Sequence, residues 1–477
     1  MLLTAVVCQL YINPAKAQQG GSRGKNGKGL RAQRANGQTA SNATDSSRPN
    51  VILLVVDDLG WGDVGYNGSK LVPTPNIDKL AAQGVIFANA YASAAVCAPS
   101  RCGIVSGAYQ EKFGIQINAD YQHYVIPESQ KLIPQTLKTG GYHTALVGKW
   151  HVSRKPETVF DEVYDPIEIS SNYFPDSAGF YGGPREPIVA FETARPRQEY
   201  LTDRLAREGM EFIDRNAHKK EPFFLYLGFN AVHNPWQAPQ KYVDRVKHVK
   251  EDHLKVYASQ IAALDDNIGL IMDHIAKNDL NKNTFIFFIS DNGPAFAGDE
   301  IKTWEKYSPG VQYLFGQTNG LKGHKAQLHE GGIRTPMFMV YPPRFYGGRV
   351  YKDMISSLDI YPTICEITGV RPPDSTVLDG VSLVPAGRGE VRNTTHEMLF
   401  WRRLNVGAVR LGVWKLYIGG NQQQLLYNLQ TDPGETTDVS NEHQEIKQRM
   451  FNAWTEWCKQ HPTNASRGKQ QAPTVPE

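Results

Sequence analysis

Four short apolar runs, each followed at once by polar residues, constrain the fold of this chain most strongly. The runs cover residues 51–56, 143–147, 223–229 and 284–289. Runs of this length without apolar–polar alternation are typical of parallel strands that are buried on both faces. Helical stretches separate them, and this alternation predicts an α/β fold with one large, mostly parallel sheet sandwiched by helices.

The clearest helical stretch is 254–276, where apolar residues recur three or four positions apart and form one face. We expect Asp265 and Asp266 within it to lie on the solvated face. In sheets of this kind, ligands bind beyond the carboxyl ends of the strands. The polar residues that follow the four apolar runs should therefore converge on one edge of the sheet, although they are far apart in the chain.

After about residue 380 the character of the sequence changes. Residues 408–417 and 424–429 predict antiparallel strands, and residues 446–458 predict a closing helix. These features indicate a small C-terminal α+β domain over 381–462. It follows a main domain over 49–380, which contains the four apolar runs.

Both ends of the chain are predicted to lie outside the folded body. Residues 1–17 have the pattern of an export signal, with an apolar stretch too short to span a membrane and a small-residue cleavage site. The basic residues that usually open such a signal are absent. Residues 18–48 are expected to form a disordered tether, and residues 463–477 a flexible tail. We therefore expect an exported protein, periplasmic or secreted, with no membrane span.

Charge and cysteine content exclude two broad classes of protein. The net charge is +3, but the first 48 residues carry seven basic groups and one acidic group, so the rest of the chain is negative. A body without a basic surplus is not built to bind nucleic acid through bulk charge. Five cysteines, including Cys8 in the signal, are too few for a disulfide scaffold at this length. Lipidation of Cys8 is the less favoured alternative, because Val7, directly before it, is not the small residue that such sites normally have.

Two pairs of oxygen donors follow the first and fourth apolar runs. Asp57 and Asp58 follow the first run, and Asp291 and Asn292 follow the fourth. Carboxylate and amide oxygens, with no thiolate or imidazole among them, suit Ca²⁺ or Mg²⁺ better than zinc. The alternative is that these residues cap turns or helices, as Asp and Asn commonly do. Two such pairs at two strand ends favour a metal site.

The segment from Cys97 to Arg101 reads as a turn into a helix, because Pro99 suits the first turn. Cys97 would then lie at a helix N-terminus, where an anion is favoured and a nucleophile is activated. A cysteine phosphatase is the rival interpretation, but its loop needs five residues between cysteine and arginine, and only three intervene here. The other alternative is a buried, unreactive cysteine.

A cationic and acid–base set completes the candidate site. Lys149 and His151 follow the second apolar run, His233 follows the third, and Lys325 comes after the fourth. Such a set can neutralise an anion with several oxygens and move protons to and from it.

Taken in chain order, these motifs resemble those of the formylglycine-dependent sulfatases of the alkaline-phosphatase superfamily. The resemblance runs from Pro49 to about Asp438. His324 and Thr335 depart from the family pattern, and His324 is a candidate for a substrate contact. The matching segments are the metal loop 50–65, the C-x-P-S-R motif 97–101 with its continuation 103–107, the G-K-W-H motif 148–151, the second metal loop 291–293, the lysine-bearing segment 321–336, and the later segments 359–363, 378–380, 426–429 and 432–435.

The resemblance implies that Cys97 is oxidised to formylglycine by a formylglycine-generating or sulfatase-maturing enzyme, the expected protein partner. One hydroxyl of the hydrated aldehyde would attack sulfur, and the second would then release sulfate from the covalent intermediate. The resemblance also implies one Ca²⁺, with Mg²⁺ as the alternative, bound by Asp57, Asp58, Cys97, Asp291 and Asn292. The implied fold is alkaline-phosphatase-like.

The same resemblance implies roles for the cations and histidines. Arg101 and Lys149 would hold the formylglycine and the charge of the sulfate. His151 would be the base that collapses the intermediate. His233 and Lys325 would bind sulfate oxygens and protonate the leaving alcohol. The implied substrate is a sulfated polysaccharide or oligosaccharide, and the implied enzyme is a sulfuric ester hydrolase.

Residues outside the motifs are candidates for contacts to the rest of the substrate. Arg154, close behind the G-K-W-H motif, is a candidate contact for a further sulfate or a carboxylate, with a surface or packing role as the alternative. Trp236, Trp304, Tyr313 and Phe315 are candidates for sugar-stacking surfaces, with packing roles as the alternative.

Two other functions stay open at this point. A phosphodiesterase or phosphonate hydrolase of the same superfamily would need further His and Asp ligands for zinc, which the sequence does not place. A chain with an unconverted Cys97 would bind sulfated glycans without cleaving them.

Overall fold

The computed structural model describes residues 48–175, 190–191, 199–296, 315–390 and 395–461. The signal, nearly all of the tether and the tail expected from the sequence lie outside these ranges and stay predictions, as does the domain boundary near residue 380. Among the helices that the structure describes, none combines the length and apolar character needed to cross a membrane.

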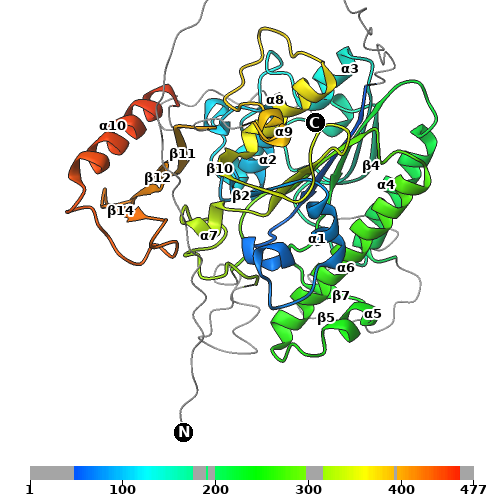
Figure 1. Ribbon diagram of the computed structural model, residues 1–477, viewed down its shortest axis with the longest axis horizontal. Coiled ribbons are helices and arrows are strands. Elements are labelled where there is room, and N and C mark those ends of the chain that lie inside the picture. Colours follow the sequence, from blue (N-terminus) through cyan, green and yellow to red (C-terminus); the bar gives the residue numbers. More distant parts are fainter. Residues whose placement is uncertain (1–47, 176–189, 192–198, 297–314, 391–394, 462–477) are drawn as a thin grey trace, which may run out of the picture. The chain divides into compact units, whose positions relative to one another are not determined.

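An eight-stranded sheet, seen edge-on among the helices in Figure 1, runs through the main part of the chain in the order β10-β2-β9-β8-β1-β6-β3-β4. Neighbouring strands are parallel except where β9 meets β2 and β8. The strands are β1 Asn50–Val56, β2 Val85–Tyr91, β3 His143–Lys149, β4 Glu162–Ile167, β6 Phe223–Gly228, β8 Thr284–Ser290, β9 Met337–Val340 and β10 Arg349–Ser356. The four predicted strands are β1, β3, β6 and β8, which lie side by side at the centre of the sheet.

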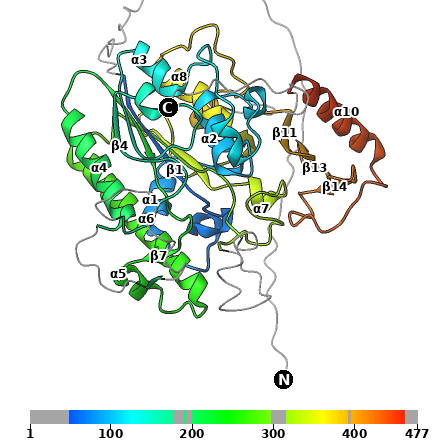
Figure 2. The same cartoon turned by 180° about the vertical axis from the view of Figure 1, so that it is seen from behind.

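Helices cover both faces of this sheet. Successive side chains of β1 point to opposite faces, so Ile52 and Leu54 join the core under α4 and α6, and Val51 and Leu53 join the core under α2 and α8. Figures 1 and 2 show α4 and α6 side by side along one face. The helices of this part are α1 Pro75–Ala82, α2 Cys97–Ser106, α3 Ile133–Thr139, α4 Leu201–Asn216, α5 Gln240–Val243, α6 Asp252–Lys277, α7 Glu330–Ile333, α8 Ile360–Thr368 and α9 Val384–Arg388, with a two-stranded β5–β7 pair at Ala190–Phe191 and Gln237–Ala238.

The helix predicted over 254–276 is α6, and its apolar face packs as expected. The expectation of a solvated Asp265 is wrong, because this side chain is fully buried. Its carboxylate accepts hydrogen bonds from the backbone N–H groups of Asn76 and Ile77, at 3.0 and 2.8 Å, where α1 begins. A helix start leaves such N–H groups without partners inside the helix, and a carboxylate supplied from elsewhere satisfies them.

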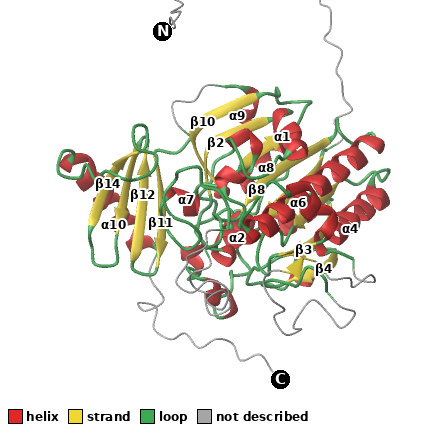
Figure 3. Ribbon diagram, turned by 90° about the horizontal axis from the view of Figure 1, so that it is seen from below, coloured by secondary structure: helices red, strands yellow, loops and turns green. Residues whose placement is uncertain are grey.

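A second sheet follows, with strand order β11-β12-β13-β14 and every neighbouring pair antiparallel (Figure 3). It confirms the small C-terminal α+β unit, although two details differ. The run 408–417 is two strands, because Gly412, with φ of 53°, lies in the turn between β12 and β13. The first strand, β11, was not predicted. The elements are β11 Met398–Arg403, β12 Val406–Leu411, β13 Trp414–Ile418, β14 Gln424–Asn428 and α10 Gln444–Gln460.

Candidate active site

The carboxyl ends of β1 and β8 bring the two pairs of oxygen donors together. These strands are neighbours, with Val56 opposite Ser290, so the two pairs leave the sheet side by side. The side chains of Asp57, Asp58, Asp291 and Asn292 are all buried. The Asp58 N–H donates to Asp291 Oδ1 at 3.3 Å. The convergence expected from the strand pattern is therefore present.

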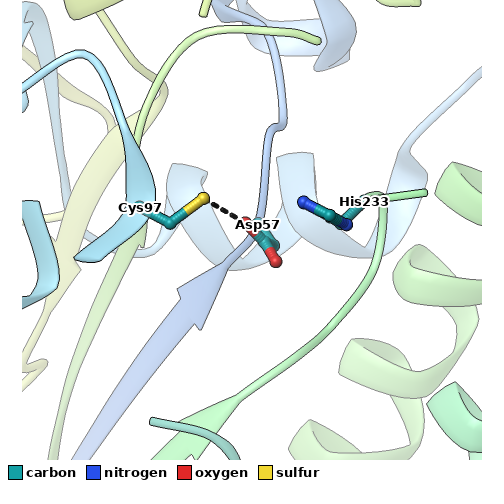
Figure 4. Close-up of side chains that lie close together, drawn as sticks. All are labelled: Asp57, Cys97 and His233. Atoms are coloured by element: carbon teal, nitrogen blue, oxygen red, sulfur yellow. Dashed lines mark hydrogen bonds between the residues drawn. The ribbon is translucent and has the colours of Figure 1, made fainter. Parts of the chain in front are cut away.

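Cys97 begins helix α2 and points into this cluster. Its thiol donates to Asp57 Oδ1 at 3.4 Å and lies 4.0 Å from Asp58 Oδ1. Asp57, Asp58, Cys97 and Asp291 each offer a ligand atom within 4.8 Å of the others. Figure 4 shows Cys97 and His233 on opposite sides of Asp57, both directed towards it.

The Cys97 thiol is not activated as a nucleophile in this setting. Burial raises its pKa strongly, and the negative charge of Asp57 raises it further, against the smaller effect of Lys149. The sequence pattern led us to expect an activated group at the start of a helix. The carboxylates beside it outweigh that effect, so the unmodified side chain stays a thiol at neutral pH.

Three cations face the three carboxylates. Lys149 Nζ pairs with Asp57 Oδ2, Lys325 Nζ lies 2.8 Å from the Asp58 carboxylate, and Arg101 Nε lies 2.7 Å from Asp291 Oδ2. Arg101 and Lys149 are fully buried. The formal charges of these six groups cancel.

The glycine of the G-K-W-H motif explains how Lys149 reaches this position. Gly148 has φ of 84°, and a Cβ at this position would collide with the carbonyl oxygen of Gly228 on the neighbouring strand β6. Glycine therefore permits the close approach of β3 and β6 where β3 ends. Since β6 lies between β3 and β1, this close packing leaves Lys149, at the end of β3, within reach of Asp57, which follows β1.

His151 is buried beside the cluster, in a left-handed backbone conformation with φ of 52°. Its ring stands edge-on to Tyr121, with centroids 4.7 Å apart. Neither ring nitrogen has a hydrogen-bond partner among the described residues. Burial lowers its pKa well below the usual value, and Lys149 and Arg101 lower it further, so the ring is neutral at neutral pH.

His233 lies across the cluster from Cys97. Its Nδ1–H donates to the carbonyl oxygen of Asn234 at 2.6 Å, which leaves Nε2 facing Asp58 at 3.8 Å. Burial, and then the charge of Lys325, lowers its pKa to about 4. This ring is therefore also neutral at neutral pH.

Arg154 does not face the cluster, contrary to the expectation of a substrate contact. The side chain is buried, and its Nε donates to the carbonyl of Ile126 at 3.0 Å. Its other nitrogens donate to the carbonyls of Pro127 and Gln130 and to Gln135 Oε1. Because the N–H groups of the guanidinium already donate to these protein acceptors, Arg154 anchors the 126–135 segment.

Two of the four proposed stacking aromatics pack on each other. Trp236 and Phe315 are buried and parallel, with ring centroids 3.4 Å apart. Their faces are covered in this way, so the packing alternative holds for Phe315. Trp236 also borders the pocket described next. Trp304 and Tyr313 lie outside the described residues.

A pocket of about 230 Å³ opens beside the cluster. Asp58, His233 and Lys325 line it, as the sequence led us to expect. His324, one of the two departures from the family pattern, lines it as well and stacks on Phe296 with ring centroids 4.3 Å apart. Sequence reasoning missed Asn118 and Arg403, since neither lies in a recognisable motif.

Asn118 has a structural connection that the sequence did not reveal. Its Oδ1 accepts the N–H of Ala98 at 3.1 Å, in the first turn of α2. This contact ties the wall of the pocket to the helix that begins with Cys97. Asn118 is the first residue of a short 3-10 helix, and an asparagine outside any recognisable motif carries no sequence signal for such a role.

Comparisons with known proteins agree with this geometry. The family model described as Sulfatase matches residues 49–370, and the one described as N-sulphoglucosamine sulphohydrolase, C-terminal, matches residues 323–460. Mouse N-acetylgalactosamine-6-sulfatase is 28% identical over 435 residues, which cover 83% of this chain and 79% of the relative. The uncharacterized sulfatase YdeN of Escherichia coli is 30% identical over 412 residues, covering 76% and 70%.

Solved structures give the same result. The crystal structure of Ps i-CgsB in complex with k-i-k-neocarrahexaose has a TM-score of 0.74 and 30% sequence identity, and the match covers 87% of this chain and 94% of that one. The family match spans the carboxyl strand ends, Cys97 and the surrounding cations. The chain therefore belongs to the sulfatase family and is a sulfuric ester hydrolase.

Proposed function

We propose that this sulfatase removes sulfate from a sulfated polysaccharide or oligosaccharide, with formylglycine formed from Cys97 and one bound Ca²⁺. The observation that carries the proposal is the position of Cys97, whose Sγ lies 3.4 Å from Asp57 inside a buried cluster of hard oxygen donors. The carbohydrate is supported by relatives named as N-acetylgalactosamine-6-sulfatases and by a similar structure holding a neocarrahexaose.

The residues present fit a hard divalent cation. Asn292 Oδ1 is buried and has no hydrogen-bond partner among the described residues, although its Nδ2 donates to Asp58 at 2.6 Å. Carboxylate and amide oxygens are the ligands that Ca²⁺ and Mg²⁺ prefer. The six charged side chains already cancel, so a divalent cation would leave a positive site for an anionic sulfate ester. Bound there, Ca²⁺ would polarise the sulfate and the group that attacks it.

The residues also fit a modified cysteine. A thiol held protonated by burial and by Asp57 is a poor nucleophile. One hydroxyl of hydrated formylglycine would attack sulfur and displace the alcohol, and deprotonation of the second would then re-form the aldehyde and release sulfate. Cys97 is 1% exposed in the fold, so a maturing enzyme would have to reach it before the chain folds. A formylglycine-generating or sulfatase-maturing enzyme is accordingly the proposed partner.

The surrounding side chains fit the remaining roles. Arg101 and Lys149 neutralise negative charge at the cluster, where burial strengthens electrostatic effects. His151 is neutral with both ring nitrogens unpartnered among the described residues, so it is suited to accept a proton. Lys325 and His233 face the pocket, where they would contact sulfate oxygens. An anion beside His233 would raise its pKa and favour its protonation, as donation to a leaving alcohol requires.

Export is a separate part of the proposal. It rests on the apolar stretch and the small-residue cleavage site within residues 1–17. Periplasmic or secreted protein with a new N-terminus near residue 18 would support it. Full-length protein retained in the cytoplasm would contradict it.

Mass spectrometry and sulfate release together test the proposed chemistry. The peptide containing Cys97 should carry the aldehyde, and activity on sulfated saccharides should scale with the aldehyde fraction of each preparation. Cys97→Ser should fold and bind saccharide without turnover in a host that does not oxidise serine. Cys365→Ser, at a half-buried cysteine outside the cluster, is the matched control. Repeated turnover by protein without detectable aldehyde would refute the mechanism.

A further inference from the structure

We propose that Arg403 forms a second anion subsite, so that the enzyme prefers saccharides carrying another sulfate or a carboxylate besides the sulfate that is released. This inference rests on the proposed function and extends it to the rest of the substrate. Arg403 is the last residue of β11 and lines the same pocket as Lys325 and His233. It is the contribution of the C-terminal sheet to the active-site pocket.

Strand alternation directs Arg403 towards the main sheet rather than towards α10. Trp401, two residues earlier, packs on Tyr91 with ring centroids 5.4 Å apart and donates its indole N–H to Ala92 O at 2.8 Å. Arg402 lies on the opposite face, where its guanidinium donates to His461 O. Residues two apart in a strand share a face, so Arg403 lies on the Trp401 side.

The guanidinium of Arg403 has an unmet capacity to bind an anion. Its Nε is buried and has no hydrogen-bond partner, and no carboxylate forms an ion pair with it among the described residues. Arg410, in the same sheet, lies 3.3 Å from Glu330. Lys325, across the pocket, is already paired with Asp58. Arg403 is thus a pocket cation without a protein counter-charge among the described residues, and arginine binds sulfate and carboxylate oxygens through parallel hydrogen bonds.

Buried ion pairs join the sheet that carries Arg403 to the segment that carries Lys325. Residues 322–329 carry His324 and Lys325 and lead directly into Glu330, the first residue of α7. Glu330 is fully buried and pairs with Lys415 of β13 at 3.0 Å as well as with Arg410 of β12. The segment that supplies two pocket residues is therefore bound directly to the sheet that supplies Arg403. Lys325 and Arg403 line the same 230 Å³ pocket. A substrate whose released sulfate binds Lys325 would therefore bring a second anionic group to Arg403.

Paired saccharides test this subsite. The substrates are a monosulfated saccharide, its disulfated form, and a form with one sulfate and one uronic acid. We compare the wild type with Arg403→Ala and Arg403→Lys, using kcat/KM for sulfate release. Binding of the same saccharides to Cys97→Ser, with and without Arg403→Ala, is measured by calorimetry. Arg449→Ala is the control, because Arg449 is an exposed arginine of the same subdomain paired with Glu397.

Arg403→Ala should lower the preference for the doubly charged over the monosulfated saccharide by about ten- to a hundredfold, the range for losing a hydrogen bond to a charged group. Arg403→Lys should restore part of it. The form that loses its advantage identifies the second anion as sulfate or carboxylate. A preference within about twofold of wild type for both forms, or an equal loss in Arg449→Ala, would overturn the subsite. The binding arm decides the question even if no substrate is turned over, and absence of turnover by the wild type would count against the proposed function alone.

Discussion

Two buried clusters of charged side chains in this protein have similar composition. They differ in whether all of their polar atoms have a hydrogen-bond or ion-pair partner. The first, here called the catalytic cluster, consists of the charged side chains of Asp57, Asp58, Asp291, Arg101, Lys149 and Lys325 together with Asn292, His151 and His233 beside them. The second, here called the Glu330 network, consists of Glu330, Glu435, Arg410, Lys415, Tyr91 and His329. Both join segments that are far apart in the chain.

The Glu330 network is complete by itself. Glu330 accepts from Tyr91 at 2.8 Å and pairs with Lys415 and Arg410, while Glu435 accepts from His329 at 3.0 Å. Burial alone would raise the pKa of Glu330, but Lys415 and Arg410 outweigh it and lower the pKa to about 2. Buried carboxylates of this kind stabilise a fold only when every partner is present.

The catalytic cluster is incomplete. Asn292 Oδ1, both nitrogens of His151 and one terminal nitrogen of Arg101 lack partners among the described residues. Burial, followed by the charge of Asp57, raises the pKa of Asp291 to about 7 despite its contact with Arg101. The two clusters teach that buried charge alone does not mark a functional site. What distinguishes the catalytic cluster from the Glu330 network is the presence of buried polar atoms without partners among the described residues.

The largest effect should follow from Asp291→Ala. Loss of this carboxylate should reduce sulfate release by about a thousandfold or more, since metal polarisation and the Arg101 contact are both affected. Bound Ca²⁺, measured by elemental analysis, should fall with activity while circular dichroism stays native. Asp266→Ala, at a more exposed acid paired with Arg245, is the control. Full activity of Asp291→Ala, or stoichiometric zinc in active wild type, would contradict the metal assignment.

The next effect concerns the Glu330 network. Glu330→Gln leaves Lys415 and Arg410 as buried charges with reduced compensation, which should lower the free energy of unfolding by about 3–5 kcal/mol. Adding Lys415→Met to this variant should recover part of the loss. Denaturant unfolding measures both, with Glu397→Gln at an exposed ion pair as control. A change below about 1 kcal/mol for Glu330→Gln, as expected of a surface pair, would remove the contrast between the clusters.

A smaller effect separates the two histidines of the catalytic cluster. If His233 protonates the leaving alcohol, His233→Ala should slow release from sugar sulfates about ten- to a hundredfold more than release from activated aryl sulfates. His151→Ala should instead slow both substrate types and let the covalent intermediate accumulate. Intermediate accumulation is followed by mass spectrometry after rapid quenching. Equal losses on both substrates for His233→Ala would remove its assignment as general acid.

The smallest effect lies at the junction of the two sheets. His396 Nε2 lies 2.8 Å from Asp359 Oδ1, and although burial lowers the pKa of His396, this carboxylate raises it overall. A raised pKa in the fold means that the stabilisation is complete below the unfolded value near 6.5 and is lost as the pH rises through the folded value. The stability advantage of wild type over His396→Gln should therefore shrink by about 1 kcal/mol across this range. Chemical denaturation at several pH values measures it, with exposed His218→Gln as control. An advantage that grows with pH would reverse the assignment.

The sequence alone was sufficient for the centre of the molecule. The four apolar runs are β8, β1, β6 and β3, adjacent in the sheet, because strands buried on both faces leave an unmistakable apolar pattern. Parallel strands end at a common edge, so the strand pattern by itself predicts that Asp57 and Asp291 lie together. β9 is also apolar and buried throughout, but at four residues it is too short to be recognised as a strand, and it was missed.

Only the tertiary structure decided which charged side chains bind other groups of the protein and which line the pocket. Arg154 follows a catalytic motif, yet backbone carbonyls surround its guanidinium. Asp265 lies in a helix pattern that predicts exposure, yet it caps α1. Arg403 lies in no motif, yet it lines the active-site pocket. Periodicity and spacing indicate which helix or strand a residue belongs to and which face it lies on. The partner of a charged side chain, however, comes from a segment tens to hundreds of residues away. Only the packing of the whole chain brings the two into contact.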